Sequence, residues 1–239
     1  MKRSLDEIRR RCQRAAQGLG VAPGQDRDVA MGASWLAARG LPGLESLCDA
    51  LDHLDRGEPL AMPHSTGGPV VHCGDQSAAL VGPALLDYLV AGNGVAGGVW
   101  QLTGLRAPGY LLPSMALHAS AGWSSRLVPA HGRWQLVASP GGAGIWSLEG
   151  HLKDFDGFGD PLDLVATLIQ GAIPGVWIAD GVPLMAPKDL EATAKVSLGA
   201  GIEVDETTWQ RLGTYAKLVL VPASEASRSG AGPQVRDGD

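Results

Sequence analysis

The stretch Ser125–Leu148, SRLVPAHGRWQLVASPGGAGIWSL, decides the fold class. It holds three short apolar runs, at 125–128, 134–138 and 144–148, which are separated by His131-Gly132 and by Pro140-Gly141-Gly142. Short apolar runs with glycine- and proline-containing turns between them are typical of neighbouring antiparallel strands. The stretch therefore predicts a β-meander, and the later apolar runs 164–169 and 176–178 are two further candidate strands.

The sequence at the N-terminus predicts helices instead. Ser4-Leu5-Asp6-Glu7 has the pattern of a capping box, in which Ser4 caps the helix and Glu7 reaches back to it. Apolar residues then recur every three or four positions up to residue 19, and again over 25–39 and 44–54. Glycines at 20, 40 and 57 follow these segments as helix stops. Cys12 and Cys48 lie on the apolar stripes, so we expect them to be packed residues without a chemical role.

A loop rich in glycine, proline, serine and threonine covers 57–69 and separates this helical part from the rest. Beyond it we expect strands at 70–73 and 94–105, helices at 77–91 and 110–121, and a last helix that Asp205 caps. The predicted fold class is α+β: an N-terminal helical layer packed on a mixed, mainly antiparallel sheet with additional helices. We expect one domain over 1–239, with a helical layer (1–57), a mixed body (58–223) and a polar, glycine-rich tail (224–239).

Length and composition exclude several classes of protein. A chain of 239 residues with 45% apolar and 18% charged residues is not disordered and fits one globular domain. The net charge of −6 argues against a nucleic-acid partner, and we interpret the basic cluster Arg9, Arg10, Arg11 and Arg14 as a solvated helix face. The chain starts without an apolar leader and has no run of about 18 apolar residues, so we expect neither secretion nor a membrane partner.

The cysteines indicate the compartment. The three residues, Cys12, Cys48 and Cys73, are an odd number at wide spacing, which argues against a disulfide framework and for a reducing cytosol. No Cys-x-x-Cys pair is present, so a structural zinc site is not expected.

A glycine motif, Gly92-Asn93-Gly94-Val95-Ala96-Gly97, matches GxGxxG. The dinucleotide fingerprint needs a strand before it and a helix after it, whereas here a predicted helix precedes and a predicted strand follows. We interpret these residues as turn glycines, and the sequence names no cofactor.

The segment His72-Cys73-Gly74-Asp75 brings an imidazole, a thiol and a carboxylate to the end of a predicted strand. Loops that follow strands often carry chemistry, so Cys73 and Asp75 are candidate catalytic residues. Adjacent strand residues point to opposite faces, so a histidine other than His72 would have to act as the base for Cys73. The alternative interpretation of Cys73 is a packed cysteine.

The loop Asp154-Phe155-Asp156-Gly157-Phe158-Gly159-Asp160 is dense in carboxylates. Hard divalent cations take several oxygen ligands, so Asp154, Asp156 and Asp160 are candidate metal ligands. The pattern departs from an EF-hand because Phe158 stands at the fifth position, where a ligand is needed. An ordinary aspartate-rich turn is the alternative.

The two ends of the chain carry a family resemblance. The segments 4–8, 35–43 and 221–228, with the glycine-rich ending, resemble a bacterial family of unknown function, number 3726 of the domain-of-unknown-function series. That resemblance implies a cytosolic bacterial protein. Because it is most specific at the end of the chain, it adds Glu225 and Arg228 to the candidate site, where the Arg228 fork would clamp a carboxylate. A disordered acidic tail is the alternative interpretation of these residues.

A second similarity concerns residues 4–54, which resemble the N-terminal helices of malate/L-lactate dehydrogenase-like enzymes, NAD(P)-dependent reductases of small 2-oxo acids. Those enzymes place a catalytic histidine just before a Gly-Leu, where this chain has Leu41-Pro42 before Gly43-Leu44. Kinship would therefore imply that this acid is absent here.

Three hypotheses about function follow. The first is an accessory or ligand-binding protein in small-molecule metabolism, of organic or amino acids, which partners such an oxidoreductase. The second is an enzyme whose site combines Cys73, Asp75, Glu225 and Arg228. The third is a structural or assembly subunit, in which a tryptophan-rich surface binds another protein or a second copy of the chain.

Overall fold

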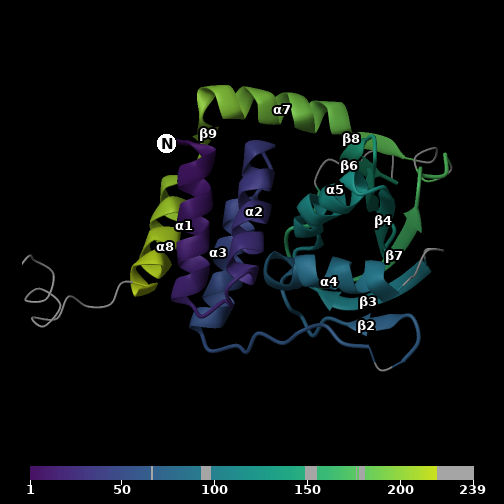
Figure 1. Ribbon diagram of the computed structural model, residues 1–239, viewed down its shortest axis with the longest axis horizontal. Coiled ribbons are helices and arrows are strands. Elements are labelled where there is room, and N and C mark those ends of the chain that lie inside the picture. Colours follow the sequence, from purple (N-terminus) through teal and green to yellow (C-terminus); the bar gives the residue numbers. More distant parts are fainter. Residues whose placement is uncertain (66, 93–97, 149–154, 176, 178–180, 220–239) are drawn as a thin grey trace, which may run out of the picture.

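The computed structural model describes residues 1–65, 67–92, 98–148, 155–175, 177 and 181–219 (Figure 1). A layer of helices lies on one side of the molecule and a twisted sheet on the other, with α4 and α5 between them (Figure 1). The N-terminal layer contains α1 (Leu5–Gly18), α2 (Gln25–Ala38) and α3 (Gly43–Asp55), as the apolar spacing predicts.

The capping box at the start of α1 is confirmed. Ser4 Oγ accepts a hydrogen bond from the Glu7 backbone N–H at 3.2 Å, and Glu7 Oε2 accepts one from the Ser4 backbone N–H at 2.9 Å. These bonds satisfy donors that the first turn of a helix would otherwise leave free. The inner stripe of α1, which includes Ile8 and Cys12, is fully buried. Cys48 is also fully buried, so the prediction of two packed cysteines is confirmed.

In the part of the chain that the structure describes, the main sheet has seven strands in the order β2-β3-β7-β4-β5-β6-β8. The predicted meander is present as β4 (Trp123–Pro129), β5 (Trp134–Ser139) and β6 (Gly142–Ser147), all antiparallel. The remaining strands are β2 (Val70–His72), β3 (Gly98–Leu105), β7 (Leu162–Gln170) and β8 (Val182–Met185). The pair β2–β3 is parallel and every other neighbouring pair is antiparallel, which confirms the mixed, mainly antiparallel sheet.

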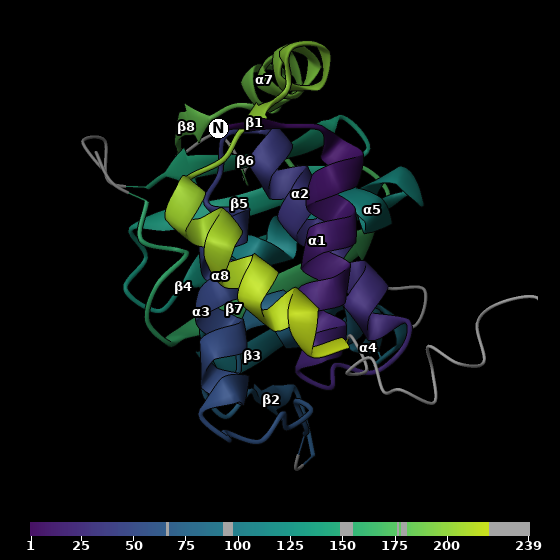
Figure 2. The same cartoon turned by 90° about the vertical axis from the view of Figure 1, so that its left-hand side faces the viewer.

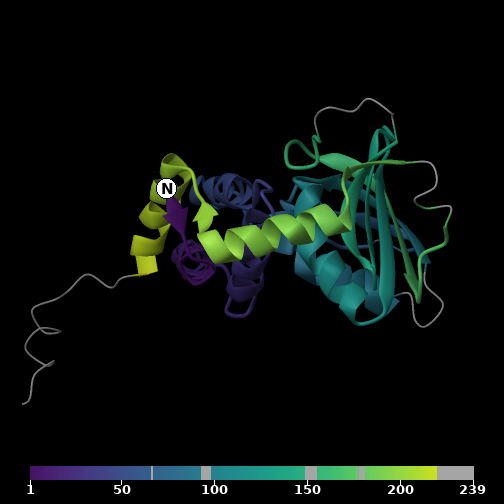
Figure 3. The same ribbon diagram turned by 90° about the horizontal axis from the view of Figure 1, so that it is seen from above.

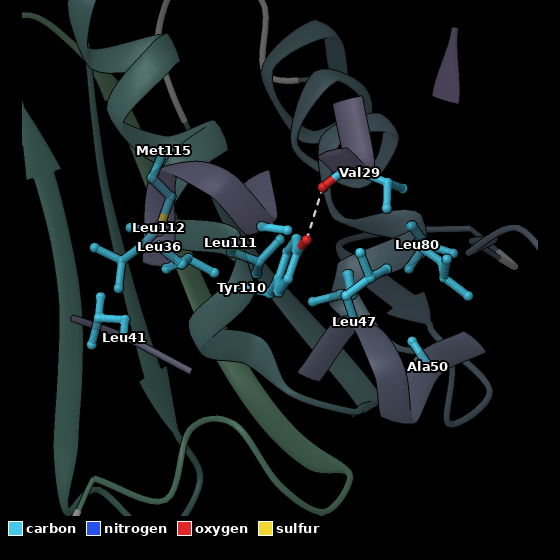
Figure 4. Close-up of a cluster of buried hydrophobic side chains, with 14 of the residues drawn as sticks. Val29, Leu36, Leu41, Leu47, Ala50, Leu80, Tyr110, Leu111, Leu112 and Met115 are labelled. Carbon is cyan, nitrogen blue, oxygen red and sulfur yellow. Dashed lines mark hydrogen bonds between the residues drawn. The ribbon is translucent and has the colours of Figure 1, made fainter. Parts of the chain in front are cut away.

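Two helical segments fill the space between the sheet and the N-terminal layer. Helix α4 (Ala78–Gly92) contains Pro83, and the short 3-10 helix η1 (Pro108–Leu111) leads directly into α5 (Leu112–Ser120). The Tyr110 hydroxyl donates to the Val29 carbonyl of α2 over 2.8 Å, in the middle of the apolar cluster that Figure 4 shows. One continuous buried cluster therefore joins the helices to the sheet.

The C-terminal part of the described chain returns to the N-terminal layer. Helix α7 (Pro187–Ala200) crosses from the sheet to the helices (Figure 3), and its presence is not predicted from the sequence. Strand β9 (Ile202–Glu203) then pairs with β1 (Lys2–Arg3) in an antiparallel ladder. Helix α8 (Glu206–Ala216), capped by Asp205 as predicted, lies beside α1 (Figure 2) and continues as the 3-10 turn η2 (Lys217–Val219).

The α+β class is therefore confirmed. Two further predictions concern residues that the structure describes only in part. The apolar run 176–178 and the glycine motif 92–97 lie largely outside the described residues. Among the helices that are described, none has both the length and the apolarity to cross a bilayer.

Candidate functional site

A polar cleft opens where α3 faces the ends of β2 and β3. It consists of a cavity of about 250 Å³ and a smaller adjoining one, and both contact Ala50, His53, Ser77 and Arg106. We call it the Arg106 cleft. Its other lining residues come from α3 and the loop after it, from the turn after β2 and the start of α4, from the residue after Arg106 and from the loop before β7: Ser46, Asp49, Asp52, Leu54, Arg56, Glu58, Pro59, Asp75, Gln76, Leu80, Ala107, Phe158, Gly159 and Asp160.

The parallel pairing of β2 with β3 creates this cleft. Parallel strands end at the same edge of a sheet, so the turns that follow them lie side by side. The Arg106 backbone N–H donates to the Gln76 carbonyl at 3.0 Å, and the Arg106 carbonyl accepts from the Ala78 N–H at 2.8 Å. The loop before β7 is tied to the same place because the Ala107 N–H donates to the Gly159 carbonyl at 3.0 Å. Three segments that are distant in sequence are thus fixed around Arg106.

The backbone of the cleft is in an uncommon conformation. Among the described residues, Asp75 and Ala107 are the non-glycine residues with a positive φ, 57° and 51°. Backbone strain of this kind is found preferentially at functional sites. Gly104 also has a positive φ, 63°, and a Cβ there would lie 2.7 Å from Asp75 Oδ1. A glycine is therefore required for the Asp75 carboxylate to approach β3.

Arg106 supplies a cation without an acidic partner. Its Nε donates to the Asp75 carbonyl oxygen over 3.4 Å, and in the described part of the chain no carboxylate oxygen lies within 4.0 Å of its guanidinium. Ser77, beside it, precedes the first turn of α4, where the positive end of the helix dipole lies. The guanidinium and the start of the helix are the two positive groups of a cleft that Asp75 and Asp160 also line.

The other charged groups of the cleft are largely paired. His53 Nδ1 lies 2.7 Å from Glu58 Oε2, and Arg56 lies 3.5 Å from the same carboxylate. The hydrogen bond from His53 is the main cause that lowers the pKa of Glu58. Asp49 and Asp52 bind Arg211 of α8, and Asp52 also accepts from the Tyr215 hydroxyl. Asp160 is exposed and lines the cleft, and neither it nor Asp75 forms an ion pair with the described residues.

The structure separates the candidate catalytic residues. Asp75 lines the cleft, whereas Cys73 is 2% exposed. Burial, together with the Asp163 carboxylate, raises the pKa of the Cys73 thiol to about 12. A thiol of this kind is almost entirely protonated at neutral pH and is a weak nucleophile. Glu225 and Arg228 lie outside the described residues, so their part in the site stays a prediction.

The candidate metal ligands have different surroundings. Asp156 accepts a hydrogen bond from the Trp134 indole N–H and lies 3.8 Å from Arg133, whereas Asp160 belongs to the cleft. The described residues contain no group of three or more histidine, cysteine or acidic side chains that could hold a metal. Asp154 lies outside them, so a site that includes all three aspartates stays a prediction.

A second pocket, of about 410 Å³, lies between α2, α4 and α5. Apolar side chains such as Trp35 and Leu117 form most of its wall. His118 Nε2 lies 2.9 Å from Asp87 Oδ1 at its mouth, and Asp28 faces the same space. Burial and the Asp87 carboxylate raise the pKa of Asp28.

Sequence reasoning missed the central residue of the cleft. Arg106 stands between a strand and a 3-10 helix, in a stretch that carries no recognised motif. Its place follows from the parallel pairing of β2 with β3, which no local signal in the sequence shows. Residues after such strands share an edge with the residues after their partner, here Arg106 and Ala107.

Comparison with known proteins agrees with the resemblances drawn from the sequence. The family described as protein of unknown function (DUF3726) matches residues 3–79, about a third of the chain. No curated protein matches the sequence significantly.

The fold has counterparts among solved structures. Malate dehydrogenase from Pyrococcus horikoshii OT3 superposes with a TM-score of 0.63 at 12% identity, over 93% of this chain and 97% of that one. Sulfolactate dehydrogenase from Methanocaldococcus jannaschii gives 0.60 at 10%, over 91% and 97%. Δ1-Piperideine-2-carboxylate reductase from Pseudomonas syringae pvar. tomato gives 0.56 at 13%, over 90% and 99%. At these identities the likeness concerns the fold, and it confirms that the chain has the architecture of malate/lactate dehydrogenase-like enzymes.

Proposed function

We propose that this protein binds a small carboxylic acid, of the organic-acid or amino-acid class, in the Arg106 cleft. It would act as an accessory or ligand-binding protein in small-molecule metabolism. The observation that carries the proposal is Arg106, whose backbone is held at the end of β3 by hydrogen bonds and whose guanidinium has no carboxylate partner among the described residues. A guanidinium presents paired N–H donors that match the two oxygens of a carboxylate.

The opposing charges of the cleft narrow the ligand class. Asp160 and Asp75 are carboxylates of the cleft without an ion-pair partner among the described residues, so the cleft offers a cation and carboxylates to the same molecule. A ligand that carries a hydroxyl or an ammonium group beside its carboxylate would satisfy both. The fold relatives are named for malate, sulfolactate and Δ1-piperideine-2-carboxylate, and each of these compounds carries a carboxylate.

Two observations favour binding over cysteine catalysis. The Cys73 thiol is buried and has a raised pKa, which disfavours nucleophilic attack. Leu41-Pro42 stands where the dehydrogenase-like enzymes resembled by the sequence have their catalytic histidine. An accessory role beside such an oxidoreductase is consistent with a retained fold and an absent acid.

Calorimetric titration tests the proposal with L-malate, L-lactate and L-proline as probes. We expect one of these to bind the full-length protein, and Arg106→Gln to weaken that binding about tenfold or more, because a charge-assisted hydrogen bond is lost. Arg106→Lys should retain part of the affinity. Arg27→Gln, which removes the same charge from an exposed position of α2 away from the cleft, is the matched control. Binding that is unaffected by Arg106→Gln, or equally reduced by Arg27→Gln, contradicts the proposal.

Native mass spectrometry of the protein from its own host tests the accessory role. Co-purification of an oxidoreductase supports it, whereas a homo-oligomer without ligand supports the structural-subunit alternative.

A second candidate function rests on the pocket between α2, α4 and α5. The His118–Asp87 pair has the geometry of a general acid–base group, with a carboxylate that orients the imidazole. Reduction of a 2-oxo acid by NADH or NADPH that His118→Asn abolishes would support this enzyme. If Arg106→Gln abolishes this reduction and His118→Asn does not, the activity belongs to the Arg106 cleft.

A further inference from the structure

A groove in the helical layer is lined by several positively charged side chains, although the protein as a whole has a net charge of −6. It has a volume of about 390 Å³ and runs between α1 and α8, which lie side by side in Figure 2. We call it the Arg11 groove. Its lining consists of Arg3, Glu7, Arg10, Arg11, Arg14, Trp209, Gly213, Ala216 and Lys217.

Two arginines of the groove are held in place by one tryptophan. The guanidinium carbon of Arg11 lies 4.3 Å from the centre of the Trp209 ring, and that of Arg3 lies 4.9 Å from it. Trp209 itself is 7% exposed, so it forms the floor of the groove. Cation–π contacts fix both side chains before any ligand arrives.

A glycine makes this arrangement possible. A Cβ at Gly213 of α8 would lie 2.2 Å from Arg11 Nη1 and would displace the guanidinium. With glycine at this position, Arg11 can lie directly on the helix beside Trp209. The place of Arg11 thus depends on a residue of another helix.

Two of the five cations of the groove have an acidic partner, and the other three have none among the described residues. Arg3 pairs with Glu7 at 3.5 Å and Arg10 with Asp6 at 2.7 Å. The side chains of Arg11, Arg14 and Lys217, by contrast, form no hydrogen bond or ion pair with another described residue. Arg3 Nε is also buried without a hydrogen-bond acceptor among the described residues. Burial, and then the neighbouring Arg3 charge, lower the pKa of Arg11, because the two like charges repel each other.

We propose that the Arg11 groove is a binding site for a small polyvalent oxyanion, a compound with two or more phosphate or carboxylate groups. Such an anion would receive N–H donors from Arg11, Arg14 and Lys217 and would remove the repulsion between Arg3 and Arg11. Its several negative charges match a groove with one carboxylate, Glu7, and five cations. The site is separate from the Arg106 cleft and does not depend on the function proposed there.

Isothermal titration of the full-length protein with inorganic pyrophosphate and, separately, with citrate tests this site. We expect saturable binding that weakens as the salt concentration rises. Tighter binding of pyrophosphate would assign a phosphate ligand, and tighter binding of citrate a polycarboxylate. No saturable binding of either compound at low ionic strength would overturn the proposal.

Three variants locate the binding. Arg11→Gln should weaken it about tenfold or more, since a charge-assisted contact is lost. Gly213→Ala should weaken it too, by displacing Arg11, although it improves the helix propensity of α8. Arg9→Gln removes the same charge from the same helix outside the groove and should leave binding unchanged. An equal loss in Arg9→Gln and Arg11→Gln would overturn the proposal, because it would indicate nonspecific attraction.

Discussion

Replacing Asp26 with asparagine tests how a buried carboxylate ties α1 to α2. Asp26 is 2% exposed and accepts three hydrogen bonds: from Gln13 at 3.0 Å, from Gln17 at 2.5 Å and from the Gly24 backbone N–H at 2.8 Å. Burial alone would raise the pKa of Asp26, but the hydrogen bonds outweigh it and hold the pKa below its ordinary value.

The expected loss of stability in Asp26→Asn follows from these hydrogen bonds. A hydrogen bond to a charged group contributes about 1.5–3 kcal/mol. Asparagine removes the charge from all three bonds and replaces one accepting oxygen with an NH₂ group, which is itself a donor. We therefore expect Asp26→Asn to lower the free energy of unfolding by about 2–3 kcal/mol at pH 7, a large part of a typical total of about 5–15 kcal/mol.

The stabilisation by Asp26 depends on pH, and the direction of its pKa shift determines how. The folded-state pKa of Asp26 is depressed, so its stabilisation is complete above the unfolded-state pKa and is lost as pH falls through the folded-state pKa. Urea unfolding of both proteins should therefore show a difference at pH 7 that shrinks as the pH falls below about 4. Asp28→Asn is the matched control, because burial raises the pKa of Asp28 and removal of its charge should not destabilise the fold at pH 7. Equal stability of Asp26→Asn and wild type at pH 7 would refute the reasoning.

Two further predictions concern packing and thiols. In thermal melts, Gly18→Ala should lower the free energy of unfolding by about 1–3 kcal/mol, because the added Cβ would lie 2.1 Å from the Tyr215 carbonyl oxygen. Gly199→Ala is the control: its Cβ would meet nothing within 4 Å, so it should be neutral or slightly stabilising. Equal melting shifts in the two variants would contradict this account of the α1–α8 contact. Cys12, Cys48 and Cys73 should all resist iodoacetamide at pH 8 in the native protein and react after unfolding, because all three are buried with raised pKa values. Selective, rapid labelling of Cys73 would revive its role as a nucleophile.

Local signals in the sequence predict much of the fold. The capping box at Ser4, the glycine stops and the turns at His131-Gly132 and Pro140-Gly141-Gly142 each determine structure within a few residues, and the corresponding helices and strands are present. Helix α7 escapes prediction because its sequence, PKDLEATAKVSLGA, has a weak apolar stripe, with Leu190 and Ala194 as its buried residues. Its position depends on contacts with β6 and α2 that lie far away in sequence.

The candidate site is predictable to a smaller extent. Asp75 and Asp160 could be selected as unusual loop residues, and the structure places both on the Arg106 cleft. Arg106 could not, because its role follows from parallel pairing of β2 with β3, which joins residues about 30 positions apart. The sequence predicts a solvated face for the basic residues of α1, but it does not show that Trp209 and Gly213, which are distant in the chain, form a groove with Arg11.

The most direct test of the central claim is an NMR titration that follows the side-chain Nε–H resonance of Arg106, assigned by its loss in Arg106→Lys. On addition of the carboxylic acid that binds most tightly in calorimetry, this resonance and the backbone amides of Ser77 and Ala107 should shift together and saturate at one dissociation constant. Saturation of shifts around His118 instead, with Arg106 unchanged, would contradict the account and move the binding site to the pocket between α2, α4 and α5.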